Sequence, residues 1–263
     1  MTDSPTVGAA LADATVRLRD AGSPSPRLDA EVLLAHSTAH DRSWLLAHPE
    51  APLTDAAFEA VLERRAAGEP VAYIRGFKEW RSLRIRTDAR ALIPRPETEL
   101  LAEAAMTEIA TRLARDEEPV TAWELATGSG AVALVIALRF RQALELGRLG
   151  LIASDVSPDA LELAAENLAA HGVEGLISLG RADLLEQAGA TLPRPDVIVA
   201  TCRTSRARRS MPARDRLATS RASRWTEGPM ALTCCADSSL TCRSGPHRGR
   251  RRCWSSGSVR STR

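Results

Sequence analysis

Trp123-Glu124-Leu125-Ala126-Thr127-Gly128-Ser129-Gly130-Ala131-Val132 is the most informative stretch of this 263-residue chain. An apolar run ends in an acid, a small-residue turn with two glycines follows, and an aliphatic run then covers residues 131–138. This pattern predicts a strand, a tight turn and a helix. Glycine tolerates positive φ and lets backbone N–H groups approach a ligand, so the turn is typical of a nucleotide-binding site.

Two acids are placed to share this site. Glu124 precedes the glycines, and Asp155 ends the next apolar run. In dinucleotide-binding folds the acid instead follows the glycines by about twenty residues. Acids at two strand ends favour S-adenosylmethionine, whereas the G-x-G-x-x-A spacing of Gly128, Gly130 and Ala133 also fits an NAD-binding protein. The turn alone leaves both alternatives open.

Helices and strands alternate after the turn. Ser157 is placed to cap a helix that ends near His171, and apolar runs predict a third strand at residues 176–179 and a fourth at 196–200. This order predicts an α/β fold with a doubly wound, Rossmann-like sheet. Ligands of such sheets bind beyond the carboxyl ends of the strands, so Glu124, Asp155, Asp183 and the residues after Ala200 are expected to share one crevice.

The residues before the turn predict two further parts. Apolar residues at helical spacing predict a helical domain over residues 1–69. A hairpin linker is expected over residues 70–95, with strands within 71–80 and 83–86. Pro96 is placed to start a helix that runs to Arg115, and the nucleotide-binding domain is expected over residues 96–200.

Composition separates the last part of the chain from the rest. Residues 1–200 carry 20 Lys and Arg against 30 Asp and Glu, whereas residues 201–263 carry 15 against 3. All five cysteines lie after residue 200, where Val, Ile, Leu, Met and Phe number only six, so we expect a disordered tail without a core. No apolar run has the length of a membrane span, which is about 20 residues, and the N-terminus does not resemble a signal peptide. A cytoplasmic protein is expected.

Four motifs in this order resemble the protein glutamine methyltransferases that modify peptide-chain release factors. The motifs are Ser25-Pro-Arg-Leu-Asp-Ala-Glu31, Glu69-Pro-Val-Ala-Tyr-Ile-Arg-Gly76, Leu92-Ile-Pro-Arg-Pro-Glu-Thr-Glu99 and Ala126-Thr-Gly-Ser-Gly130. The resemblance covers residues 1–200 and implies an S-adenosylmethionine-dependent methyltransferase domain with its first four strands. The reaction it implies is methylation of the glutamine side-chain amide in the Gly-Gly-Gln motif of class 1 release factors, by a monomer that needs no metal, membrane or nucleic acid.

The resemblance also implies the cofactor contacts. Thr127, Gly128, Ser129 and Gly130 would hold the methionine end, Asp155 the ribose hydroxyls, and Asp183 with Leu184 would lie near the adenine. Glu124 is the acid before the turn. Ala126 stands where the family usually has glycine; its methyl group can crowd the ligand, although many turns accept alanine when φ is negative.

The acceptor motif of the family, Asn-Pro-Pro-Tyr, is missing. It should follow the fourth strand, but the chain has Thr201, Cys202, Arg203 and Thr204 there. An amide nitrogen is a poor nucleophile that must be held and aimed at the methyl group. The resemblance therefore predicts that this chain is inactive.

A shifted reading frame accounts for the missing motif. Residues 201–205, written as ACC TGC CGT ACG TCC and read one base earlier after an A, encode Asn-Leu-Pro-Tyr-Val. In the same displaced frame, residues 223–237 yield a stretch that resembles the family before its last helix. Trp225 and Met230 each have only one codon. Their bases are therefore fixed, and they are the bases that the second stretch requires.

Two alternatives assign a function to the tail itself. Its clustered arginines would suit a nucleic-acid-binding protein, although no known motif accompanies them. A zinc site from Cys234, Cys235, Cys242, Cys253 and His247 does not fit the usual ligand spacing.

Overall fold

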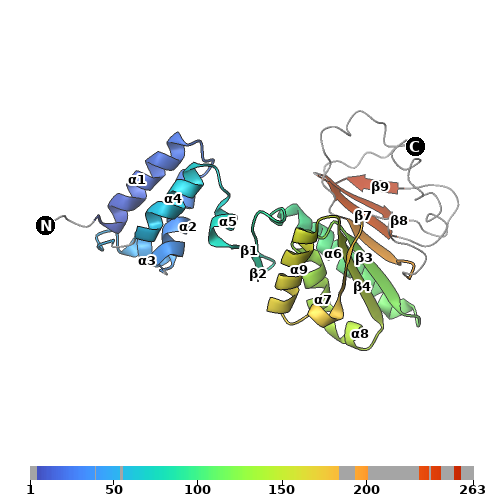
Figure 1. Cartoon of the computed structure of the whole chain (residues 1–263). Helices are drawn as coiled ribbons and strands as arrows, with labels where there is room; N and C mark the ends of the chain where they lie inside the picture. Colours follow the sequence, from blue (N-terminus) through green and yellow to red (C-terminus); the bar gives the residue numbers. More distant parts are fainter. Residues whose placement is uncertain are drawn as a thin grey trace. The chain divides into compact units, whose positions relative to one another are not determined.

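The computed structural model describes residues 5–38, 40–53, 56–183, 193–200, 231–236, 238–243 and 252–255. It divides the chain into two compact units, one of residues 1–78 and 87–89 and the other of residues 79–86 and 90–263 (Figure 1).

The first unit is the helical bundle that the sequence predicted. Its helices are α1 (Val7–Asp20), α2 (Pro26–Thr38), α3 (Arg42–Ala47), α4 (Ala56–Ala66) and α5 (Val71–Arg75). Thr6 caps α1 and Asp41 caps α3, each through a side-chain oxygen that accepts a backbone N–H of the first turn. Apolar residues from α1 and α2, among them Leu11 and Leu33, form the core.

Two buried acids of the Ser25–Glu31 motif stabilise this bundle. Glu31 accepts from Arg27 Nε at 2.6 Å and from Arg42 Nη2 at 2.7 Å. Asp29 accepts from Arg65 Nε at 2.9 Å. Burial acts to raise the pKa of Glu31, but the hydrogen bonds from the two arginines outweigh it and lower this pKa below its ordinary value. The motif therefore has a packing role in this unit.

Val71–Arg75 forms a helix, α5, where the sequence predicted a strand. β-branched and aromatic residues favour strands, but Pro70 supplies the backbone geometry of a helix start. Gly76 ends the helix in the left-handed conformation with a φ of 75°. β1 (Phe77–Trp80) therefore begins later than expected, and it pairs with β2 (Leu83–Arg86).

The second unit is the predicted α/β fold. Its elements up to residue 200 are α6 (Glu97–Arg115), β3 (Val120–Leu125), α7 (Ala131–Arg139), α8 (Arg141–Glu145), β4 (Leu149–Asp155), α9 (Pro158–Ala170), the 3-10 helix η1 (Glu174–Leu176), β5 (Ser178–Arg181) and β6 (Val197–Ala200). The sheet order is β5-β4-β3-β6-β7-β8-β9, and β5, β4, β3 and β6 are parallel, which is the Rossmann-like arrangement. The helix after Pro96 and the strand-turn-helix around residue 128 are confirmed.

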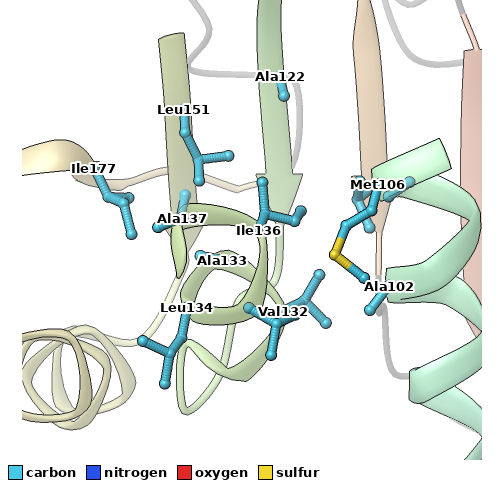
Figure 2. Close-up of a cluster of buried hydrophobic side chains, with 14 of the residues drawn as sticks. Ala102, Met106, Ala122, Val132, Ala133, Leu134, Ile136, Ala137, Leu151 and Ile177 are labelled. Carbon is cyan, nitrogen blue, oxygen red and sulfur yellow. The ribbon is translucent and has the colours of Figure 1, made fainter. Parts of the chain in front are cut away.

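α7 lies at the centre of the core. Residues 131–137 of this helix are all buried, and Figure 2 shows its Val132 and Ile136 in a cluster with Met106 of α6 and Ala122 of β3. A helix that is apolar all round must be buried against neighbours on several sides. This packing fixes where α7 begins and thereby fixes the preceding turn.

β5 begins two residues later than predicted, because η1 takes up residues 174–176. Beyond residue 200 the described residues form β7 (Ala231–Ala236), parallel to β6, and then β8 (Ser238–Arg243) and β9 (Arg252–Ser255), each antiparallel to its preceding neighbour. The expectation of a disordered tail over residues 201–263 stays a prediction.

Candidate functional site

The glycine turn lies where the strand order of the sheet reverses. β3 is paired with β4 on one side and with β6 on the other, and its last residue, Leu125, is level with Ser154 and Ala200. Asp196 ties β6 to β3, because its Oδ2 accepts from Thr121 N at 2.8 Å. Ligands of open α/β sheets bind beyond the carboxyl ends of the strands at such a reversal point.

Glu124 lies beneath the turn with an exposed fraction of 1%. Its Oε2 accepts from Thr127 Oγ1 and from Ala133 N, both at 2.8 Å, so it joins β3 to the turn and to the first turn of α7. Within the described part of the chain, its Oε1 is buried with no hydrogen-bond partner. Burial raises the pKa of Glu124 to about 8, against the effect of the two hydrogen bonds. The carboxyl is thus largely protonated at neutral pH.

Asp155, at the end of β4, holds the other side of the turn. Its Oδ2 accepts from Gly128 N at 2.9 Å and its Oδ1 from Ser157 N at 3.0 Å. Each carboxylate oxygen has a second lone pair, so this half-buried group can still accept hydrogen bonds from a ligand. The two predicted acids therefore lie on either side of the turn.

Three alternate positions of the turn have unusual backbone requirements. Ala126 has a φ of 57°, Gly128 57° and Gly130 76°. The negative φ with which many turns accept alanine is not found at Ala126, because the chain must reverse directly after β3 and the left-handed conformation makes that bend. Alanine in this conformation carries strain on the order of 1–2 kcal/mol that glycine would avoid.

There is also little room for a side chain at Gly130. A Cβ built on it would lie 3.0 Å from the Cβ of Ala164 in α9, which is tighter than most real Cβ contacts. α9 therefore packs directly on the turn. The buried Ser129 lies between these contacts, and its carbonyl accepts from Asn167 Nδ2 at 2.9 Å.

The other predicted site residues are less well placed by the structure. Asp183 is exposed just after β5. Leu184 and the expected acceptor positions Thr201, Cys202, Arg203 and Thr204 lie outside the described residues, as does His247 of the zinc alternative. Across the described ranges, no group of three or more His, Cys, Asp or Glu side chains could hold a metal ion. No described helix is both long enough and apolar enough to cross a membrane.

Comparison with known proteins shows which proteins the chain is similar to. Residues 9–76 match the family model of the PrmC N-terminal domain. The release factor glutamine methyltransferase of Vibrio cholerae is 44% identical to this chain over 177 residues, which are 65% of this chain and 58% of the Vibrio protein. The chain is thus similar to release factor glutamine methyltransferases, and its N-terminal helical unit matches the PrmC N-terminal domain.

Other release factor glutamine methyltransferases match the same way. The release factor glutamine methyltransferase of Aliivibrio fischeri is 43% identical over 149 residues, 56% of this chain and 48% of that protein. The chain thus spans about half the length of the curated relatives it matches. Among solved structures, a putative protein-L-isoaspartate O-methyltransferase from Plasmodium falciparum in complex with S-adenosyl-L-homocysteine has a TM-score of 0.43 and 14% identity, over 62% of this chain and 71% of that one.

Proposed function

We propose that residues 1–200 are the body of an S-adenosylmethionine-dependent methyltransferase that acts on the glutamine side-chain amide of class 1 release factors. The observation that carries the proposal is the glycine turn at the reversal point of the sheet, with Glu124 on one side and Asp155 on the other. The names of the relatives supply the substrate class. The proposal includes that the protein is a cytoplasmic monomer and that it binds its partner through protein contacts.

The residues of the turn fit the cofactor. Asp155 has free lone pairs for ribose hydroxyls, and the unpartnered Oε1 of the buried Glu124 marks a polar position on the other side of the turn. Gly128 and Gly130 adopt positive φ and have no side chain, so the backbone there is open to a ligand. The bound cofactor would supply an electrophilic methyl group on a sulfonium, to be taken up by the glutamine amide nitrogen. The NAD alternative is less well supported, because the acid precedes the glycines.

The reading-frame hypothesis belongs to this proposal. A chain without the Asn and Tyr of the acceptor motif after Ala200 has no group in the family's position to hold the amide. Loss of one positioning contact costs about a hundredfold or more in rate, so we expect no detectable methylation. Resequencing of the gene around the Ala200 codon tests the hypothesis. An uninterrupted frame whose codons do not encode Asn-Leu-Pro-Tyr in the shifted register would contradict it, and restoring the displaced base should restore methylation of a release-factor peptide.

The cofactor proposal is tested by calorimetric titration of the full chain with S-adenosylhomocysteine. Asp155→Ala should weaken binding by about tenfold or more, because it removes a ribose acceptor and a tie to Gly128. Gly128→Val should abolish binding, because a β-branched residue cannot adopt the φ of 57° without strain. Asp159→Ala, an exposed acid in the first turn of α9, is the matched control. Binding of NAD with no response to S-adenosylhomocysteine would reject the proposal.

A further inference from the structure

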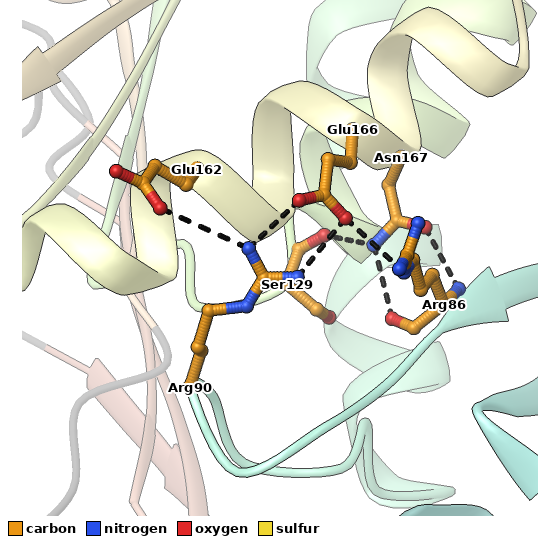
Figure 3. Close-up of polar contacts among 6 residues, drawn as sticks. All are labelled: Arg86, Arg90, Ser129, Glu162, Glu166 and Asn167. Carbon is orange, nitrogen blue, oxygen red and sulfur yellow. Dashed lines mark hydrogen bonds and ion pairs between the residues drawn. The ribbon is translucent and has the colours of Figure 1, made fainter.

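Asn167 connects two segments that are far apart in the sequence. It is the only asparagine in the chain and has an exposed fraction of 1%. Its Oδ1 accepts from Arg86 N at 2.7 Å, and its Nδ2 donates to Arg86 O at 3.1 Å and to Ser129 O at 2.9 Å (Figure 3). One side chain thus joins the last residue of β2 to the glycine turn.

The chemistry of the carboxamide suits this role. The amide has two N–H donors and one carbonyl oxygen, and here both donors meet carbonyls while the oxygen meets an N–H. Aspartate has the same shape but only acceptors when ionised, so it would place a carboxylate oxygen against two carbonyl oxygens. Replacement by aspartate therefore tests the donors without changing side-chain volume.

The preceding residue of α9, Glu166, holds the chain segment that follows β2. Glu166 accepts from Arg90 Nη1 at 2.8 Å and Nη2 at 3.0 Å, and lies 3.1 Å from Arg86 Nε. Figure 3 shows Glu166 and Asn167 side by side on α9, with Arg86 and Arg90 turned toward them. Ala91 follows Arg90, and its Cβ is 3.9 Å from the position a Cβ on Gly128 would take. Arg90, which is anchored to α9 through Glu166, is thus adjacent to Ala91, which borders the turn.

We propose that Asn167 is a positioning residue of the cofactor site. Through Asn167, ligand binding at the turn also orders the backbone at Arg86 and Ala91. The inference rests on the proposed cofactor function. A group that holds two segments through one side chain couples their order, so a ligand that orders one segment also orders the other. Asn167 touches no cofactor atom in this proposal and acts through the carbonyl of Ser129.

The test is residue-resolved amide hydrogen exchange on the full chain, with and without S-adenosylhomocysteine. In the unaltered protein the ligand should slow exchange at Ser129 and also at Arg86 and Ala91. In Asn167→Asp the affinity should fall about tenfold, and Arg86 and Ala91 should no longer respond. Glu166→Gln, a change at the surface that leaves the core intact, should keep affinity within about twofold and reduce the response of Ala91 alone. Glu162→Gln is the control, since Glu162 lies 3.9 Å from Arg90 with 72% of its side chain exposed.

The outcomes separate this inference from the proposed function. If Asn167→Asp lowers stability throughout but keeps the affinity and the linked response, Asn167 is merely structural and the inference is overturned. If the unaltered protein binds no S-adenosylhomocysteine, the proposed function fails. The role of Asn167 is then decided by comparing Asn167→Asp with the unaltered protein in the absence of ligand. In that comparison Asn167→Asp should speed exchange at the turn amides around Ser129, and unchanged exchange there overturns the inference as well.

Discussion

Two buried glutamates, one in each unit, have opposite surroundings. Glu31 in the helical unit accepts hydrogen bonds from two charged arginine side chains, and its pKa is lowered. Glu124 in the α/β unit accepts hydrogen bonds only from a hydroxyl and a backbone N–H, both uncharged, and burial raises its pKa to about 8. The comparison shows that burial alone does not set the charge of a carboxyl, because the formal charge of its donors can reverse the result. Glu31 holds helices together through charged arginines that favour its anionic form, and Glu124 is a largely neutral group that organises the glycine turn.

The largest effect that would break this contrast is expected at Glu124. A carboxyl whose pKa rises on folding binds its proton more tightly in the folded state, so its contribution to stability is complete below about pH 4.5 and is lost as pH rises toward 8. Glu124→Gln, which resembles the protonated form, should remove this loss and raise the free energy of unfolding at pH 8.5 by on the order of 2–4 kcal/mol.

Urea denaturation of the α/β unit from pH 5 to pH 8.5, followed by hydrogen exchange, measures the effect. Glu117→Gln replaces an exposed acid of the same unit and should leave the pH slope unchanged. Equal pH slopes for Glu124→Gln and the unaltered protein would show that Glu124 is ionised when buried.

A smaller effect of opposite sign is expected at Glu31. A carboxyl whose pKa falls on folding contributes stability above its ordinary pKa of 4.5, and that contribution is lost as pH falls through the folded value. Glu31→Gln should therefore destabilise the helical unit at pH 7 by about 1–2 kcal/mol, a reduced figure because Arg27 and Arg42 are half-exposed and can be hydrated.

The difference in stability between the variant and the unaltered protein should shrink as pH falls from 7 to 3. Exchange of core amides in α2 at pH 7 and thermal denaturation at both pH values provide the measurement, with Glu63→Gln on α4 as an exposed control. A loss of stability that is equal at pH 3 and pH 7 would mean that packing, and not charge, explains the effect.

The smallest effect sharpens the contrast by separating charge from backbone strain at the turn. Ala126→Gly should stabilise the α/β unit by about 1 kcal/mol, because glycine adopts the φ of 57° without a Cβ penalty. Ala165→Gly, at an exposed position within α9, should instead destabilise by about 0.5–1 kcal/mol. If both changes lower the melting temperature equally, Ala126 carries no strain that glycine relieves.

Local patterns were sufficient for much of the fold. The acid, the glycines and the aliphatic run that follows them predicted β3, the turn and α7, and Pro96 predicted the start of α6. The one-turn helix α5 was missed, because residue preferences pointed to a strand while Pro70 and Gly76 determined the backbone.

The site was predictable only in part. Glu124, Asp155 and the glycines could be found because each follows a recognisable strand. Asn167 could not, since its partner Arg86 is 81 residues away and nothing in the local sequence distinguishes a buried amide from an exposed one. The φ of Ala126 depends on how β3 meets the turn, which the residue type does not reveal.

The pairing of β6 with β3 has a consequence for the order of folding during synthesis. Thr121 and Asp196, which exchange two hydrogen bonds, are 75 residues apart in the chain, whereas β3 pairs with β4 over a much shorter separation. Closing a longer loop costs more entropy, and a strand can add only after it has left the ribosome. Glu124 and Asp155 are therefore expected to meet on the nascent chain before β6 exists. The glycine turn would then be assembled early, and β6 would join the sheet afterwards.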